Sequence, residues 1–281
     1  MIPAEFDYVA PASLDEALAA LREGGEDAKV LAGGHSLLPL MKLRLAAPTL
    51  LVDLRKVGLT GVTRENGTAR FGAMTRHTDV ATGGFGLASA AAATIADQQV
   101  RNMGTIGGTL AHGDPASDMP AVLLATEGSV VARGAGGDRE IAASELFEDY
   151  LTTSLAPDEI ITEVRIPAMD GYGWGYQKFN RRAEDWAMVG VVALVKKGSD
   201  GSCEDVRIGL THMASTPVRA TAVESALRGQ GLDAQSIASA AEQAAEGTDP
   251  PGDLNATPDY KRHLARVLTR RALEQAAGVS S

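Results

Sequence analysis

Two glycine pairs with hydroxyl side chains nearby are the residues of this sequence best suited to bind a ligand. One lies in "LAGGHSLLP" at 31–39 and the other in "MGTIGGTLAHGDPASD" at 103–118. Glycine tolerates positive φ and lets other groups approach the backbone, so such turns can expose N–H groups to an anion. Neither segment contains Lys or Arg, so a phosphate there would need backbone N–H groups and the hydroxyls of Ser36, Thr105 and Thr109. Two such turns that meet in space could hold the two phosphates of a dinucleotide.

Each glycine pair taken alone also fits an ordinary tight loop. The chain has 31 glycines, so some adjacent pairs are expected by chance, as at Gly24-Gly25 and Gly136-Gly137. The sequence contains neither G-x-G-x-x-G nor G-x-x-x-x-G-K-[ST], which argues against a Rossmann fold and a P-loop. Spacing alone therefore leaves both interpretations open.

Composition limits the class of protein and the chemistry it can perform. A formal net charge of −10 would repel a polyanion, which argues against nucleic acid as a partner. No apolar run approaches the roughly 18 residues of a transmembrane segment. The acidic start of the chain lacks an apolar signal core, which predicts a cytoplasmic protein.

The residues that bind metals or perform nucleophilic catalysis are sparse. Cys203 is the single cysteine, so the chain cannot hold an iron–sulfur cluster on its own thiolates. The five histidines show no HxxxH or HxH spacing, and we predict no metal site and no catalytic side chain. Redox chemistry would therefore use an organic cofactor or the metals of a partner.

Local patterns predict the elements that must position the two glycine segments. Ser13 and Glu16 form a capping box at the start of a helix over 13–24. Asn66-Gly67 predicts the turn of a hairpin over 61–73. Other patterns predict strands over 28–32, 49–54, 128–133 and 159–167, and helices over 87–100 and 115–126.

The composition changes at 168–177, "AMDGYGWGYQ", where three glycines among aromatic residues predict a domain junction. A second hairpin is expected from strands over 186–197 and 204–213. Helices are then predicted over 219–228, 233–246 and 258–276. Strands followed by helices that pack on them predict an α+β layer for this half.

The chain resembles the FAD-binding medium subunit of the molybdenum hydroxylases, a family that includes the medium subunit of carbon monoxide dehydrogenase and the flavin portion of xanthine dehydrogenase. The resemblance covers nearly the whole chain. It is carried by "AGGHSLLP", "QQVRNMGTIGGTLAHGDPASDMP", "FDYVAPASLDEAL", "DEIITEVRIP" and "KFNRRAEDWAMV". It implies an α+β fold with a two-lobed PCMH (vanillyl-alcohol-oxidase-type) FAD-binding domain over 1–170, with lobes of about 1–56 and 57–170. A smaller domain over 175–281, a β-sheet packed on helices, would follow.

The same resemblance implies FAD as the cofactor and indicates which residues bind it. The first loop is Ala32, Gly33, Gly34, His35, Ser36 and Leu37, and the second is Thr105, Ile106, Gly107, Gly108 and Thr109. Asp118 matches a polar FAD contact, Ile161 a position near the adenine, and Lys178 a lysine near the flavin ring. Many family members have Gln in place of His35, so the contact expected there is through the backbone.

Several of these residues also fit ordinary structural roles. Asp118 could cap a helix or form an Asx turn beside Pro120. Ile161 could be a strand core residue, and Lys178 a solvated lysine at a strand edge. Trp186 and Tyr176 flank Lys178 and could lie over the flavin ring, although an aromatic residue beside a strand is more often part of a core.

The resemblance implies electron relay. Electrons would pass from a large molybdopterin subunit through a small [2Fe-2S] subunit to the FAD of this chain, and from there to an external acceptor. The three subunits would form a dimer of heterotrimers. Two alternatives stay open: a stand-alone FAD oxidase, which would need its own substrate pocket and base, and an assembly subunit without a redox role. The sequence specifies neither the substrate nor the acceptor.

Overall fold

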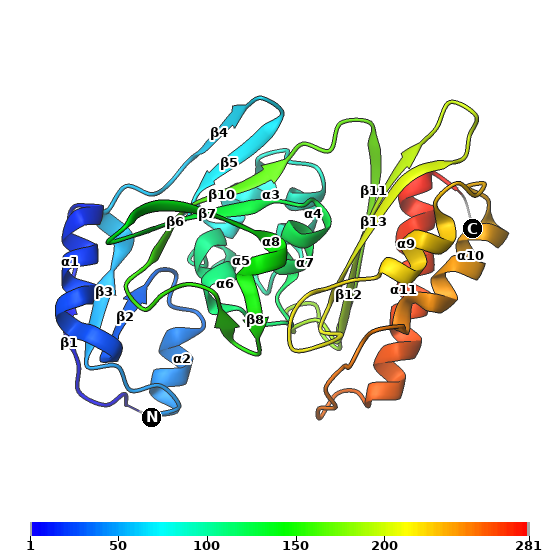
Figure 1. Ribbon diagram of the computed structural model, residues 1–281. Helices are drawn as coiled ribbons and strands as arrows, with labels where there is room; N and C mark the ends of the chain where they lie inside the picture. Colours follow the sequence, from blue (N-terminus) through cyan, green and yellow to red (C-terminus); the bar gives the residue numbers. More distant parts are fainter. Residues whose placement is uncertain (1, 280–281) are drawn as a thin grey trace.

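Three larger β-sheets with their helices lie side by side in the computed structural model, which describes residues 2–279 (Figure 1). The first sheet contains the N-terminal strands, the second lies in the middle, and the third carries its helices on the outer face. Within the described residues, no helix is both long enough and apolar enough to cross a lipid bilayer.

The first sheet is parallel, with strand order β1-β3-β2. Its elements are β1 (Asp7–Val9), α1 (Leu14–Gly24), η1 (Gly25–Asp27), β2 (Ala28–Leu31), α2 (Leu37–Lys42), β3 (Leu50–Asp53) and η2 (Leu54–Lys56). The predicted start of α1 is confirmed, because the Ser13 hydroxyl accepts from the Glu16 N–H at 3.2 Å. The Glu16 carboxylate accepts from the Ala12 N–H at 2.8 Å, one residue earlier than a standard capping box requires.

The second sheet is antiparallel, with strand order β4-β5-β10-β6-β7. Its strands are β4 (Val62–Glu65), β5 (Thr68–Gly72), β6 (Ser129–Gly134), β7 (Gly137–Ala142) and β10 (Ile160–Pro167). The predicted hairpin is confirmed: Asn66 and Gly67 have φ of 50° and 72°, the positive values that a type I′ turn requires.

Short helices connect and cover the second sheet. They are α3 (His77–Thr82), α4 (Leu87–Ala93), α5 (Gln98–Arg101), α6 (Ile106–His112), α7 (Asp118–Ala125) and α8 (Ala143–Leu146), with a small hairpin of β8 (Phe147–Asp149) and β9 (Thr152–Thr153). The helix expected over 87–100 is broken where Ala96 adopts a φ of 40°. The helix expected over 115–126 starts only at Asp118, because the Asp114 carboxylate accepts from the Ala116 N–H at 2.8 Å and forms an Asx turn.

The third sheet is antiparallel, with order β11-β12-β13-β14. Its elements are β11 (Tyr172–Phe179), β12 (Val189–Lys197), β13 (Cys203–Thr211), β14 (Val218–Arg219), α9 (Thr221–Leu227), α10 (Ala234–Ala241), η3 (Glu242–Ala245) and α11 (Pro258–Ala277). The hairpin and the three helical stretches predicted here are confirmed. Every residue of α7 is buried, because this helix packs between the second sheet's helices and strands β12 and β13.

The glycine- and aromatic-rich segment over 168–177 is mostly strand, and the domain junction expected there stays a prediction. Only 168–171 precede β11, whose glycines face α11. A Cβ on Gly173 or Gly175 would lie 2.0 Å or 2.1 Å from a carbonyl oxygen of that helix. These glycines therefore let the helix backbone pack directly on the sheet.

A charged cluster lies inside the core between the third sheet and its helices. Lys261 is 0% exposed, and its Nζ donates to Asp253 Oδ2 at 2.7 Å and lies 3.2 Å from His212 Nε2. His212 Nδ1 in turn lies 2.8 Å from the carbonyl of Ala187, and its backbone N–H donates to that of Pro115 at 2.8 Å. The cluster therefore links α11 to the segment that leads into α7.

We expect the two partners of this ion pair to differ in their effect on stability. Asp253→Ala would leave the Lys261 ammonium buried without its anion, at a cost of about 3–5 kcal/mol. Lys261→Met fills a similar volume and leaves Asp253, 32% exposed, in contact with water, so its cost should be clearly smaller. Urea unfolding of the two variants measures the order, and a larger loss for Lys261→Met would contradict the assignment.

Candidate functional site

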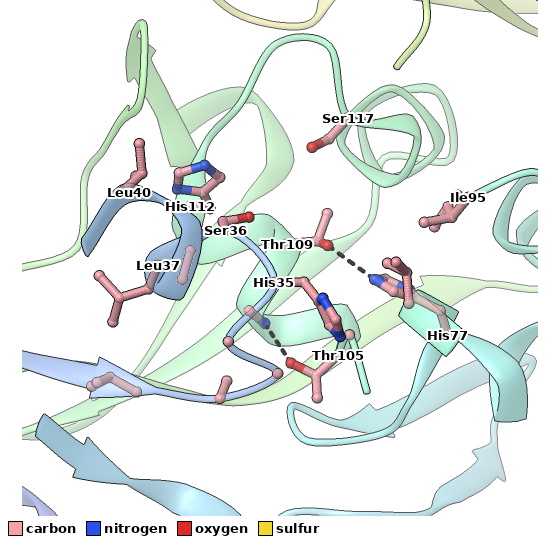
Figure 2. A pocket seen from close by; sticks show the side chains of 18 of the residues that line it. His35, Ser36, Leu37, Leu40, His77, Ile95, Thr105, Thr109, His112 and Ser117 are labelled. Atoms are coloured by element: carbon pink, nitrogen blue, oxygen red, sulfur yellow. Dashed lines mark hydrogen bonds between the residues drawn. The ribbon is translucent and has the colours of Figure 1, made fainter. Parts of the chain in front are cut away.

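Both glycine segments line one cavity of about 530 Å³ between the first and second sheets (Figure 2). Residues 32–36, between β2 and α2, form one wall together with Leu37 at the start of α2. Thr105, Gly108 and Thr109 at the start of α6 form another. Lys178 on β11 and Asp118 on α7 also border the cavity. A concave site of this volume suits an organic ligand of cofactor size.

The two segments touch through their backbones. A Cβ on Gly33 would lie 2.6 Å from the carbonyl oxygen of Met103 and 2.7 Å from the Cα of Gly104. A Cβ on Gly108 would lie 3.3 Å from the Cβ of Ala32. Gly33 is thus required for the contact between loops that lie about seventy residues apart in the sequence, and Gly108 leaves room for Ala32.

The first loop presents unpaired backbone donors. Gly34 has a φ of 76°, which turns the chain after β2 and favours glycine. The N–H groups of residues 33–36 donate to no other group among the described residues. Such a row of N–H groups at a cavity wall can bind an anion.

The second loop differs from the expectation of an equivalent backbone cradle. Its N–H groups anchor α6 to the protein: Ile106 donates to Thr75 O (3.0 Å), Gly107 to Ala73 O (2.9 Å) and Gly108 to Thr105 Oγ1 (3.2 Å). Thr105 is the N-cap of α6, a position at which a threonine hydroxyl satisfies a free N–H group. This side of the cavity therefore offers the hydroxyls of Thr105 and Thr109 rather than glycine N–H groups.

Asp118 and Lys178 form a buried ion pair at the wall of the cavity. Both side chains are 5% exposed, and Nζ lies 3.0 Å from Oδ2 of Asp118 and 3.0 Å from the carbonyl oxygen of Thr94. The Tyr176 hydroxyl donates to Oδ1 of Asp118, and burial, followed by the Asp118 charge, raises the pKa of Tyr176 well above 10. Lys178 is therefore not a solvated edge residue, and Asp118 does not cap α7, whose N-cap position is Ser117.

Three of the sequence-predicted residues do not line the cavity. Ile106, Gly107 and Ile161 are buried in the core around the second sheet. His35 is exposed and lies at the cavity in Figure 2. Of the two aromatic candidates, Trp186 borders the cavity and is 57% exposed. The Tyr176 hydroxyl instead donates a hydrogen bond to Asp118.

Sequence reasoning missed several cavity residues, above all His77. Its side chain is 2% exposed and its Nε2 lies 3.0 Å from the hydroxyl of Thr109. Ile95, Ser117 and the segment 153–157 also contribute to the lining. No local pattern distinguishes these residues, since they reach the cavity only through packing.

Comparison with known proteins defines the class of this site. The family model described as "FAD binding domain in molybdopterin dehydrogenase" matches residues 4–169. The model described as "CO dehydrogenase flavoprotein C-terminal domain" matches residues 174–276. Both glycine segments that line the cavity thus lie in the part matched by the FAD-binding model, and Lys178 lies in the part matched by the C-terminal model.

Relatives match the chain along almost its full length. The carbon monoxide dehydrogenase medium chain of Hydrogenophaga pseudoflava is 41% identical, covering 98% of each chain. The 6-hydroxypseudooxynicotine dehydrogenase complex subunit alpha of Paenarthrobacter nicotinovorans is 38% identical, covering 98% of this chain and 96% of the relative. A solved structure of carbon monoxide dehydrogenase from Hydrogenophaga pseudoflava matches with a TM-score of 0.95 and 42% identity, covering 99% of each chain.

The chain therefore belongs to the family of FAD-binding medium subunits of molybdenum-containing hydroxylases and dehydrogenases. It is a flavoprotein subunit of an oxidoreductase with FAD as its cofactor, and the expected α+β fold, an FAD-binding domain followed by a C-terminal domain, is confirmed. The boundaries expected for domains and lobes stay predictions, as does the assignment of individual residues to FAD.

We expect Gly33→Ala to weaken FAD binding at least tenfold without unfolding the chain. Its Cβ would meet the backbone of Met103 and Gly104, so the two loops must separate; a tenfold loss corresponds to about 1.4 kcal/mol. Gly136→Ala is the matched control, because no atom lies within 4 Å of its Cβ position. Titration of the apoprotein with FAD, followed by flavin fluorescence, gives both affinities. Wild-type affinity in Gly33→Ala would show that the loop contact does not shape the site.

Proposed function

We propose that this chain relays electrons through its FAD, from a partner [2Fe-2S] subunit to an external acceptor. The observation that carries the proposal is the cavity at the contact of the two glycine loops. It combines a row of free N–H groups, hydroxyls and one buried lysine. The buried carboxylate of Asp118 is hydrogen-bonded to Lys178 and Tyr176, so it is not available as a base for a substrate.

In this proposal the two loops hold the pyrophosphate in different ways. The N–H groups of residues 33–36 would bind one phosphate, and the hydroxyls of Ser36, Thr105 and Thr109 would add donors. Hydrogen bonds to a charged acceptor contribute about 1.5–3 kcal/mol each. Several of them can therefore hold a pyrophosphate without a side-chain cation in either loop. Because the Ile161 side chain lies in the core, a contact with FAD at that position would be through the backbone.

Lys178 is proposed to lie beside the flavin ring. Bound FAD supplies the redox chemistry, since its ring system accepts and releases electrons. The lysine has three N–H donors, of which Thr94 and Asp118 take two. The third has no partner among the described residues and is free for the cofactor, while Asp118 limits the net positive charge at this point.

We expect Lys178→Met to make the flavin midpoint potential more negative, by roughly 30 mV or more if the interaction is worth about 1.4 kcal/mol for a two-electron couple. The variant removes the cation and leaves the Asp118 carboxylate unpaired nearby. Lys178→Met combined with Asp118→Asn removes both charges and should lie closer to the wild type. Anaerobic spectroelectrochemical titration measures the potentials. If Lys178→Met keeps FAD at an unchanged potential, the lysine does not act on the flavin.

The proposed partners follow from what this chain lacks. Cys203 is 1% exposed within β13, and burial raises the pKa of its thiol to about 11, so it is not a reactive or metal-binding thiolate. The relatives are named as a medium chain and as a subunit of a dehydrogenase complex. We therefore assign this chain a small [2Fe-2S] subunit and a large molybdopterin subunit as partners in a dimer of heterotrimers. Its location in the cytoplasm stays a prediction.

Substrate-dependent flavin reduction tests the relay. The purified chain with FAD should be reduced by dithionite but not by carbon monoxide, aldehydes or N-heterocycles under anaerobic conditions. Co-expression with iron–sulfur and molybdenum chains from neighbouring genes should give a stable assembly in which one of these substrates reduces the flavin. Complete reduction by a substrate with this chain alone would favour the stand-alone oxidase. A chain that binds no FAD would favour the assembly role.

A further inference from the structure

His77 is fixed against the backbone of the second glycine loop. Its backbone N–H donates to the carbonyl of Gly104 at 3.0 Å, and the preceding Arg76 forms an isolated β-bridge with Thr105. A Cβ on Gly104 would lie 2.9 Å from Cδ2 of the imidazole, so the ring packs directly on this glycine. The start of α3 and the start of α6 therefore keep a fixed relative position.

The imidazole of His77 makes one hydrogen bond, to the hydroxyl of Thr109 (Figure 2). Its Nε2 lies 3.0 Å from Thr109 Oγ1, while Nδ1 is buried and has no partner among the described residues. The Thr109 hydroxyl makes no other hydrogen bond within the described part of the chain, and it lies at the cavity. A hydroxyl has one donor and two acceptor positions, so it can receive one bond from His77 and still donate another.

The protonation of His77 limits how this hydrogen bond can run. Burial, and then the nearby charge of Arg101, lower its pKa to about 4, so the ring is neutral at pH 7 and carries one N–H. If that proton were on Nδ1, a buried N–H donor would have no acceptor, which is rarer in proteins than an acceptor without a donor. With the proton on Nε2, the ring donates to Thr109 and the unpaired atom is an acceptor nitrogen.

We propose that His77 is a positioning residue for FAD: its Nε2–H donates to Thr109 Oγ1 and thereby directs the threonine O–H into the cavity, toward a phosphate oxygen. This inference rests on the proposed role of the second loop in binding the pyrophosphate. The N–H groups of Gly107 and Gly108 are already bonded within the protein. The loop would instead bind through a polarised chain of hydrogen bonds, in which the imidazole donates to the hydroxyl and the hydroxyl donates to the phosphate. The neutral ring supplies this orientation without adding a charge.

A double-mutant cycle on the full chain tests the proposal, with FAD affinity of the apoprotein as the readout. Thr109→Val and His77→Phe should each weaken FAD binding about tenfold. Together they should weaken it no more than Thr109→Val alone, because the histidine acts only through the hydroxyl. His77→Gln places an amide N–H near the position of Nε2 and should recover most of the affinity. His263→Phe, the same change at an exposed histidine of α11, should leave affinity unchanged.

The possible results separate this inference from the proposed function. Equal losses from His77→Phe in the wild-type and Thr109→Val backgrounds would show that the ring acts only by packing and would overturn the proposal. So would wild-type affinity in His77→Phe, or a His77→Gln variant no better than His77→Phe. If His77→Phe does not fold, His77→Leu, which also removes the donor, is compared in the two Thr109 backgrounds: a loss of affinity in the wild-type background alone supports the proposal, and any other result overturns it. Absence of FAD binding by the wild-type chain would instead refute the proposed function.

Discussion

The backbone contact between Gly33 and the Met103–Gly104 segment is the constraint on which the site depends. No side chain fits between these loops, since even a Cβ would lie 2.6 Å from a carbonyl oxygen. The close approach of the two backbones places the free N–H groups of one loop opposite the hydroxyls of the other. The first N–H groups of α6 anchor this helix to the protein and so hold the second loop in place. The site is thus built from two unlike walls, one of backbone donors and one of side-chain hydroxyls.

The third sheet completes the site through a buried ion pair. Lys178 lies on β11, and Asp118 lies on α7, a helix that is buried along its whole length. Two charges taken out of water are stable only when geometry and additional hydrogen bonds compensate for their lost hydration. Thr94 and Tyr176 provide those bonds. The domain that carries no glycine loop therefore supplies the cavity's buried cation and fixes its position.

The parts of the fold that the sequence predicts well are those with a local cause. The helix cap at Ser13 and the turn at Asn66-Gly67 involve atoms within a few residues of one another. The predictions that were wrong concern residues whose structure depends on tertiary contacts, which local propensities do not describe. Alanine-rich residues 87–100 suggest one helix, but the chain bends at Ala96. The second glycine pair suggests free N–H groups, but the N–H groups of Ile106 and Gly107 donate to the carbonyl groups of Thr75 and Ala73.

By itself, the sequence determined that two glycine segments could hold the phosphates of a dinucleotide, that any redox chemistry would use an organic cofactor or the metals of a partner, and which family the chain resembles. These conclusions follow from residue types and their order, which fix backbone freedom, available ligands and motif identity. Only the tertiary structure decided that the second loop presents hydroxyls to the cavity, that Asp118 pairs with Lys178, and that His77 lies within hydrogen-bond distance of Thr109. The physical reason is that hydrogen-bond partners, burial and charge pairing depend on atoms brought together across 32 to 60 residues of chain. Local sequence propensities carry no information about contacts between residues so far apart in the chain.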